Sequence, residues 1–286
     1  MLITIFLSCD EFKNIFDGNN GSNADSTIVQ GDITQNTTWT LEGSPYIVID
    51  TVTVIEGIKL IIEPGVTVAF KTGCKLIVKG KLLAIGTETD SIMFTASPDT
   101  SVVGFRDYWC GIKFDSCENT TRLEYCFFEK YFEMEFVILC DNSSPNFSHC
   151  VFPGFVPAIE TGGGIIQCVN NSSPRIEYSR LCMYGYKTAC VACAEPHEFI
   201  NPDSSNPSLF QNDFYINDDG YVAAGGGFLN GNYIKIWNRD GTTEIDTSLG
   251  TPVDEIGDGI FTTTSKSCIN VDGITNPRAT PHFPDN

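Results

Sequence analysis

Basic residues are scarce in this chain. It contains 17 Lys and Arg against 36 Asp and Glu, which gives a formal net charge of −19. Such a balance repels the phosphates of nucleic acids, so we expect no nucleic-acid partner. An excess of acidic residues is typical of an exported protein that its own charge keeps soluble.

Patterns typical of helices are also missing. No amphipathic helical window is evident, whereas 20 Phe, 26 Gly and many Asn, Asp, Ser and Thr favour strands and turns. At 286 residues the chain is long enough to bury a sizeable core. These features predict an all-β fold.

The chain lacks the usual signatures of a metal or redox centre. Cys190 and Cys193 form a C-x-x-C pair, but the second pair of a zinc site does not follow. A thioredoxin-like site would need a βαβ context, which the sequence does not offer. His149, His197 and His282 are scattered without metal-ligand spacing. We therefore expect no cofactor, with calcium as the one metal left open.

A glycine-punctuated segment, residues 55–86, is the clearest structural signal. Its short apolar runs alternate with a period of two and are cut by glycine every six to eight residues, at Gly57, Gly65, Gly73, Gly80 and Gly86. Helices do not tolerate that density of glycine, and the Asn-Gly or Asp-Gly turns of hairpins are absent from the segment. The pattern predicts a single-stranded right-handed parallel β-helix, in which coils stack on one another.

Internal repeats support this interpretation in the second half of the chain. Segments of the type Asn-Ser-Ser-Pro followed by a short strand place four residues at equivalent positions, namely Arg122, Asn146, Arg175 and Ser208. The Asn-Ser-Ser-Pro element is turn chemistry, because its side chains bond to nearby backbone and its proline stops the preceding strand. Some of these segments also match glycosylation acceptors, at Asn119, Asn142, Asn146 and Asn171, although the turn interpretation is favoured.

Cysteines follow the same repeat. Cys126 and Cys150 occupy one repeat position, and Cys140 and Cys168 precede successive turns. Stacked coils lie about 4.8 Å apart, so each pair is either two buried thiols or a coil-to-coil disulfide. Thiols are favoured, because Cys9 is a candidate for lipid attachment (see below) and its exclusion leaves an odd number of the 12 cysteines.

The opening of the repeat region resembles a known family. Residues 36–40, 43–46 and 60–66, which read NTTWT, GSPY and LIIEPGV, are similar to the start of bacterial cell-surface right-handed β-helix proteins, of the pectate-lyase-like solenoid superfamily. The resemblance covers roughly residues 27–215. It implies a solenoid over 27–217 with an N-terminal cap, and we expect residues 218–286 to form an irregular C-terminal cap and an extended tail.

The N-terminus resembles a bacterial lipoprotein signal. Residues 1–8 are apolar and lead to Cys9, so we expect residues 1–9 to be a truncated signal of this type with Cys9 as the lipid anchor. Residues 10–26 are polar and predict a flexible tether. Together these features predict a lipid-anchored or extracellular protein of the bacterial envelope.

The pectate-lyase-like resemblance raises the question of catalysis. Enzymes of that superfamily hold calcium with clustered carboxylates on one sheet, beside an Arg or Lys that removes a proton. The middle coils offer charged candidates at Arg106, Asp107, Lys113, Asp115, Arg122, Glu124 and Glu177. Glu124 and Glu177 recur at one repeat position two coils apart, as on a solvated face. Weak calcium candidates lie at Asp254, Glu255 and Asp258.

From these observations we expect a non-catalytic, monomeric surface module that binds polysaccharide or a surface protein. The alternative is a polysaccharide lyase or hydrolase. Three carboxylates converging beside an Arg or Lys on one sheet would favour the enzyme, and a plain charged face would favour the binding module.

Overall fold

The computed structural model describes residues 26–97, 108–130, 136–153, 164–183 and 189–193, together with short segments between 205 and 245. Several sequence predictions lie outside these residues and are not addressed by the structure. They are the anchor at Cys9, the tether over 10–25, the candidates Arg106 and Asp107, and the calcium candidates Asp254, Glu255 and Asp258.

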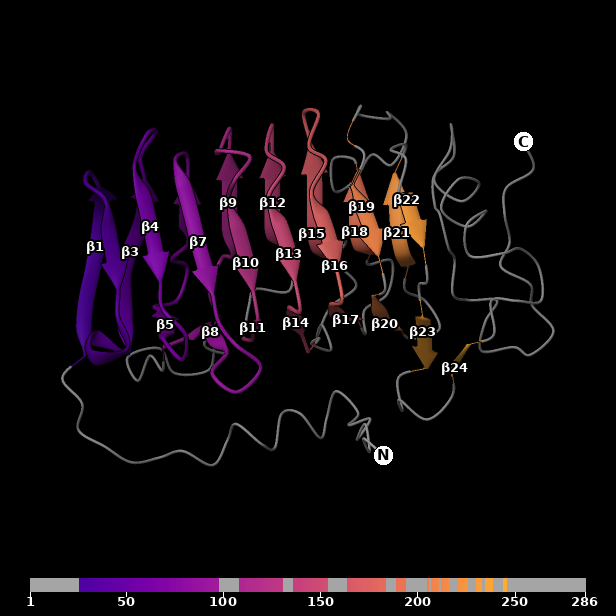
Figure 1. Ribbon diagram of the computed structural model, residues 1–286, viewed down its shortest axis with the longest axis horizontal. Helices are drawn as coiled ribbons and strands as arrows, with labels where there is room; N and C mark the ends of the chain where they lie inside the picture. Colours follow the sequence, from indigo (N-terminus) through magenta and orange to yellow (C-terminus); the bar gives the residue numbers. More distant parts are fainter. Residues whose placement is uncertain are drawn as a thin grey trace.

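The described strands form three rows that run along the molecule (Figure 1). Row A consists of β6 (Leu76–Val78), β9 (Ile112–Asp115), β12 (Phe136–Asp141), β15 (Gly164–Val169), β18 (Ala189–Cys193) and β21 (Tyr221–Gly225). Row B consists of β2 (Thr37–Trp39), β4 (Lys59–Ile62), β7 (Lys81–Ile85), β10 (Arg122–Glu124), β13 (Asn146–Ser148), β16 (Arg175–Glu177), β19 (Ser208–Phe210) and β22 (Asn230–Asn232). Row C consists of β5 (Thr67–Phe70), β8 (Ile92–Ala96), β11 (Cys126–Phe128), β14 (Val151–Phe152), β17 (Arg180–Met183), β20 (Asp213–Ile216) and β23 (Lys235–Asn238).

Rows A and C meet in one long strand near the start of the chain. The first half of β3 (Tyr46–Val54) pairs with β5 and its second half with β6, so rows A and C are counted as one sheet. The strand β1 (Thr27–Ile33) pairs in parallel along both halves of β3. A single 3-10 turn, η1 (Leu41–Gly43), precedes β3 and is the only helical element among the described residues.

Each coil of the chain contributes one strand to every row. One such coil runs through β10, β11 and β12, and the next through β13, β14 and β15, each strand pairing in parallel with its counterpart in the neighbouring coil. The fold is therefore an all-β parallel solenoid, as the sequence predicts. The strands β21, β22 and β23 continue this pairing beyond residue 217, where a cap was expected to begin. The strand β24 (Glu244–Ile245) adds the only antiparallel pair among the described strands.

The repeat register deduced from the sequence is confirmed. Arg122 pairs with Asn146, Asn146 with Arg175, and Arg175 with Ser208. Likewise Cys140 pairs with Cys168. The register is recoverable from sequence because a slip of one residue would turn every buried side chain of a strand toward solvent.

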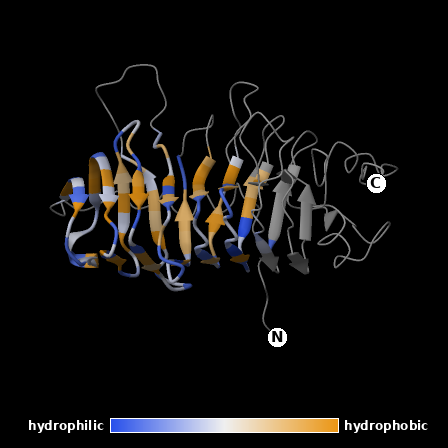
Figure 2. Ribbon diagram, turned by 90° about the horizontal axis from the view of Figure 1, so that it is seen from above, coloured by the Kyte–Doolittle hydropathy of each residue, from blue (hydrophilic) through white to orange (hydrophobic). Residues whose placement is uncertain are grey.

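The core is a column of side chains that point inward from all three rows. Figure 2 shows apolar and hydrophilic residues alternating along the coils. In row C the fully buried rings of Phe94, Phe128 and Phe152 stack with centroid distances of 5.0 and 4.5 Å. The inward-pointing residues of the other two rows are at most 1% exposed, namely Leu123, Phe147 and Ile176 in row B and Ile112, Ile138 and Ile166 in row A. Each coil thus buries its apolar face against the coils before and after it.

Serine hydroxyls tie the coils together at the corner between rows A and B. The backbone N–H of Ser143 donates to Ser172 Oγ at 3.0 Å, and that of Ser172 to Ser205 Oγ at 2.9 Å. The hydroxyls in turn donate to nearby carbonyls, from Ser143 to Asp141 O at 2.9 Å and from Ser172 to Val169 O at 2.6 Å. The turn chemistry expected of the Asn-Ser-Ser-Pro element is therefore present, and it also satisfies buried polar groups between coils.

Candidate functional site

The charged candidates from the sequence fall on two separate sheets. Lys113 and Asp115 lie on β9 of row A, whereas Arg122 and Glu124 lie on β10 and Glu177 on β16 of row B. In parallel register Ser148 separates Glu124 from Glu177. The two glutamates are thus two coils apart, about 10 Å from the strand spacing, as the sequence analysis inferred.

Each glutamate of row B is engaged by an arginine on its own strand. The guanidinium of Arg122 pairs with the carboxylate of Glu124. Arg175 Nε donates to Glu177 Oε2 at 2.7 Å, and Arg175 Nη2 reaches the same oxygen at 2.7 Å. Both arginines are about half exposed, with 49% and 56% of their side-chain surface accessible, so the pairs add little stability but fix planar polar groups at the surface.

The coil between these pairs carries uncharged groups at the same positions. Asn146 lies in register with both arginines, and Ser148 with both glutamates. Ser148 Oγ is 2.8 Å from His149 Nδ1, within hydrogen-bond distance. Along this face of the sheet, two uncharged residues therefore lie between two ion pairs.

An aromatic stack follows the edge of this sheet, at the corner between rows B and C. The rings of Tyr125 and His149 lie 4.5 Å apart at an interplanar angle of 15°, and those of His149 and Tyr178 lie 5.1 Å apart at 21°. All three residues adopt left-handed backbone conformations, with φ of 49°, 54° and 50°. Side chains rarely tolerate that region, so its repetition in three coils marks a constrained corner.

Hydrogen bonds between coils hold the corner in place. The backbone N–H of Tyr125 donates to Ser148 O at 3.0 Å, and that of His149 to Glu177 O at 3.1 Å. One residue further on, the N–H of Cys150 donates to Ser179 Oγ at 3.1 Å. The next coil repeats the arrangement, with Ser179 N donating to Asn212 Oδ1 at 2.9 Å. The rings are therefore held on a pre-organised backbone.

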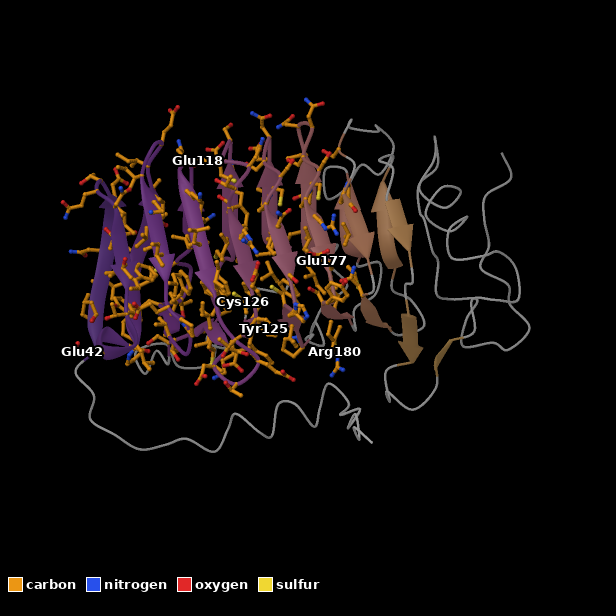
Figure 3. The ribbon with its side chains drawn as sticks, in the orientation of Figure 1. Glu42, Glu118, Tyr125, Cys126, Glu177 and Arg180 are labelled. Carbon is orange, nitrogen blue, oxygen red and sulfur yellow. The ribbon has the colours of Figure 1, made fainter. Side chains whose placement is uncertain are left out.

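We call this surface the ladder face. It has three rungs in register, consisting of Arg122, Glu124 and Tyr125, then Asn146, Ser148 and His149, then Arg175, Glu177 and Tyr178. Tyr125 and Glu177 are labelled in Figure 3, where they lie along row B. Planar amide, guanidinium and carboxylate groups beside aromatic rings can form paired hydrogen bonds and apolar contacts with a ligand.

A second ionic cluster lies on row A. Lys113 Nζ is 3.0 Å from Asp141 Oδ2 and 4.0 Å from Asp115 Oδ2, and Lys79 Nζ is 3.6 Å from Asp115 Oδ2. Asn170 Nδ2 donates to Asp141 Oδ1 at 2.7 Å. The Asn170 amide, followed by the Lys113 ammonium, holds the pKa of Asp141 below its ordinary value. This cluster brings two carboxylates beside lysines, and the described residues contain no group of three His, Cys, Asp or Glu positioned to hold a metal ion.

The lowered pKa of Asp141 predicts a pH-dependent contribution to stability. A carboxyl with a depressed folded pKa stabilises the native state above its unfolded pKa, about 3.9, and loses this contribution as pH falls through the folded value. We expect Asp141→Asn to show a smaller drop in urea midpoint between pH 7 and pH 2 than the wild type. Asn170→Ala, which removes the main cause, should be intermediate. Equal drops in all three proteins would contradict the assignment.

The cysteine columns predicted from the repeat are present as thiols. Cys126, Cys150, Cys140 and Cys168 are buried, and none of the four is in a disulfide. Burial, with the neighbouring Cys150 thiol, raises the pKa of the Cys126 thiol well above its ordinary value. A disulfide is present instead at Cys182, which the sequence analysis did not single out.

Comparisons with known proteins add no assignment. No family model matches the chain, and neither a curated protein nor a solved structure matches it. Within the described part of the chain, no helix is both long and apolar enough to cross a membrane.

The aromatic stack was missed by sequence reasoning, although a signal was available. Tyr125, His149 and Tyr178 each follow the repeat strand directly and precede Cys126, Cys150 and Ser179. A position that is aromatic in three successive repeats is the signal that could have found it.

Proposed function

We propose that this protein is an exported binding module of the bacterial envelope that holds polysaccharide on the ladder face. The observation that carries the proposal is the register of three outward rungs, each combining planar polar groups with a ring. A ligand with a repeating structure meets equivalent groups on successive coils. Because inter-coil hydrogen bonds already hold the backbone that carries the rings, binding would cost little backbone ordering entropy.

Polysaccharide fits this chemistry better than a protein partner. Vicinal hydroxyls can donate to a carboxylate and accept from a guanidinium or amide, which are the groups that the rungs present. The cores of specific protein interfaces are depleted in charged residues such as glutamate, whereas two rungs of the ladder face each carry an arginine–glutamate ion pair. A surface protein as the ligand is therefore an outcome of the test rather than our proposal.

The anchor at Cys9 is part of the same proposal and rests on its likeness to a lipoprotein signal. Acyl chains on this cysteine would hold the solenoid at a membrane surface, with residues 10–26 as the tether. No catalytic step is assigned, because the two carboxylates beside lysines on row A fall short of the three that would favour a lyase.

The proposal predicts that the full chain, expressed in a bacterial host, incorporates labelled palmitate and that Cys9→Ala abolishes the label. The purified solenoid should also be retarded in native gels that contain polysaccharide, relative to gels without it. A panel of neutral and uronate-containing polymers is the appropriate probe. No retardation by any polymer would refute polysaccharide binding, and an unlabelled full-length chain would refute the anchor.

A further inference from the structure

The charges on the ladder face are already balanced within the protein. Arg122 and Arg175 each pair with a glutamate on the same strand, and the middle rung between them carries Asn146 and Ser148. An anionic sugar that bound an arginine here would share the guanidinium with the carboxylate that it already contacts, whose negative charge offsets that of the arginine. It would also leave a glutamate facing the anion, and like charges at close range repel.

The charge of the rest of the molecule also disfavours an anionic ligand. The chain carries a formal net charge of −19, so an approaching polyanion meets a repulsive field. At low ionic strength that field extends over tens of ångströms, and about 0.1 M salt shortens it to about 10 Å. Sugar hydroxyls carry no charge and face no such penalty. They can bond to groups on the ladder face that keep their ion pairs intact.

The middle rung is suited to a neutral ligand. Ser148 Oγ is positioned 2.8 Å from His149 Nδ1, and Asn146 offers both a donor and an acceptor through its amide. Both lie in register with the ion pairs on either side, so one extended chain can cross all three rungs. The stacked rings of Tyr125, His149 and Tyr178 border this path and offer van der Waals contact to the sugar.

We propose that the ladder face binds an uncharged polysaccharide whose chain spans the three rungs. This inference rests on the proposed function and specifies the class of ligand that the site takes. The three rungs act together, so removing polar groups from either end rung weakens binding of a long chain.

Native affinity electrophoresis tests the inference with hydroxyethylcellulose and galactomannan as neutral probes and polygalacturonate as the anionic probe. We expect retardation by at least one neutral polymer and none by polygalacturonate. The double variants Arg122→Ala/Glu124→Ala and Arg175→Ala/Glu177→Ala should each bind the neutral polymer about tenfold more weakly, the equivalent of one or two lost hydrogen bonds. His149→Ala should weaken it as well.

The double variant Lys113→Ala/Asp141→Ala is the matched control. It also removes one positive and one negative side chain without changing the net charge, but from row A, where the two charged groups lie 3.0 Å apart. It should bind as the wild type does, and circular dichroism of every variant checks that the solenoid is folded. If a ladder-face variant unfolds, Arg175→Lys, which keeps the charge but loses the planar guanidinium, replaces it and should still weaken binding.

The possible outcomes separate the two proposals. Retardation by polygalacturonate alone would overturn the neutral-ligand inference and leave polysaccharide binding standing. Retardation by a neutral polymer that the ladder-face variants leave unchanged would overturn the placement of the site. Retardation by no polymer would refute the proposed function itself.

Discussion

Replacing Phe128 with alanine should lower the free energy of unfolding by about 3–5 kcal/mol, the usual cost of removing a fully buried phenyl ring. The ring is 0% exposed and stacks on Phe94 at 5.0 Å and on Phe152 at 4.5 Å. Its loss opens a cavity between three consecutive coils. In a solenoid, stability comes from interfaces between neighbours, so this cavity weakens two interfaces at once.

Urea titration followed by far-UV circular dichroism measures this effect. Ile49→Ala is the control, because Ile49 lies on β3 and is 40% exposed. Ile49→Ala should lower the free energy of unfolding by no more than about 1 kcal/mol, as for most surface substitutions. A loss below about 1 kcal/mol in Phe128→Ala would contradict the view that the stacked rings hold the middle coils together.

The second large effect is expected at Gly111, which precedes β9. Its φ is +76°, and an added Cβ would overlap the carbonyl oxygen of Val137 in the next coil and lie 2.9 Å from the carbonyl carbon. Gly111→Ala should lower the free energy of unfolding by roughly 1–2 kcal/mol because alanine is strained in the left-handed conformation. Displacement of the packed backbone should lower it by about 1–3 kcal/mol more. We therefore expect a total loss of about 2–5 kcal/mol.

Two other glycines separate these causes. Gly73 has a φ of +78° with no atom within 4 Å of an added Cβ, so Gly73→Ala should show the conformational cost alone. At Gly80 an added Cβ would overlap the carbonyl oxygens of Ile58 and Ile55, so Gly80→Ala reports mainly on the close approach. Urea midpoints of the three variants provide the comparison. A Gly111→Ala variant no less stable than Gly73→Ala would show that the backbone of the next coil yields without cost.

The repeat itself was readable from the chain. Arg122, Asn146, Arg175 and Ser208 were assigned to equivalent positions, and each pairs with the next in the structure. The assignment succeeded because inward and outward residues alternate along every strand, and Asn-Ser-Ser-Pro marks the same corner in successive coils. The turn chemistry of Ser143 and Ser172 was likewise predictable, since it depends on neighbouring residues.

The candidate site was predicted only in part. The outward position of Glu124 and Glu177 followed from the repeat, but their pairing with Arg122 and Arg175 depends on side-chain conformations. Rings that stack between coils, such as Tyr125 on His149, are brought together by register rather than by local sequence. The links from Ser143 to Ser172 and from Ser172 to Ser205 are of the same kind.

By itself, the sequence determined the fold class, the coil register and the excess of negative charge, because these follow from local alternation, turn residues and composition. The tertiary structure alone decided that rows A and C share the strand β3, that three rings form one stack, and that each arginine of the ladder face is neutralised on its own strand. These features join residues separated by connections of varying length. Their contacts are set by the spacing of stacked coils, which no local pattern encodes.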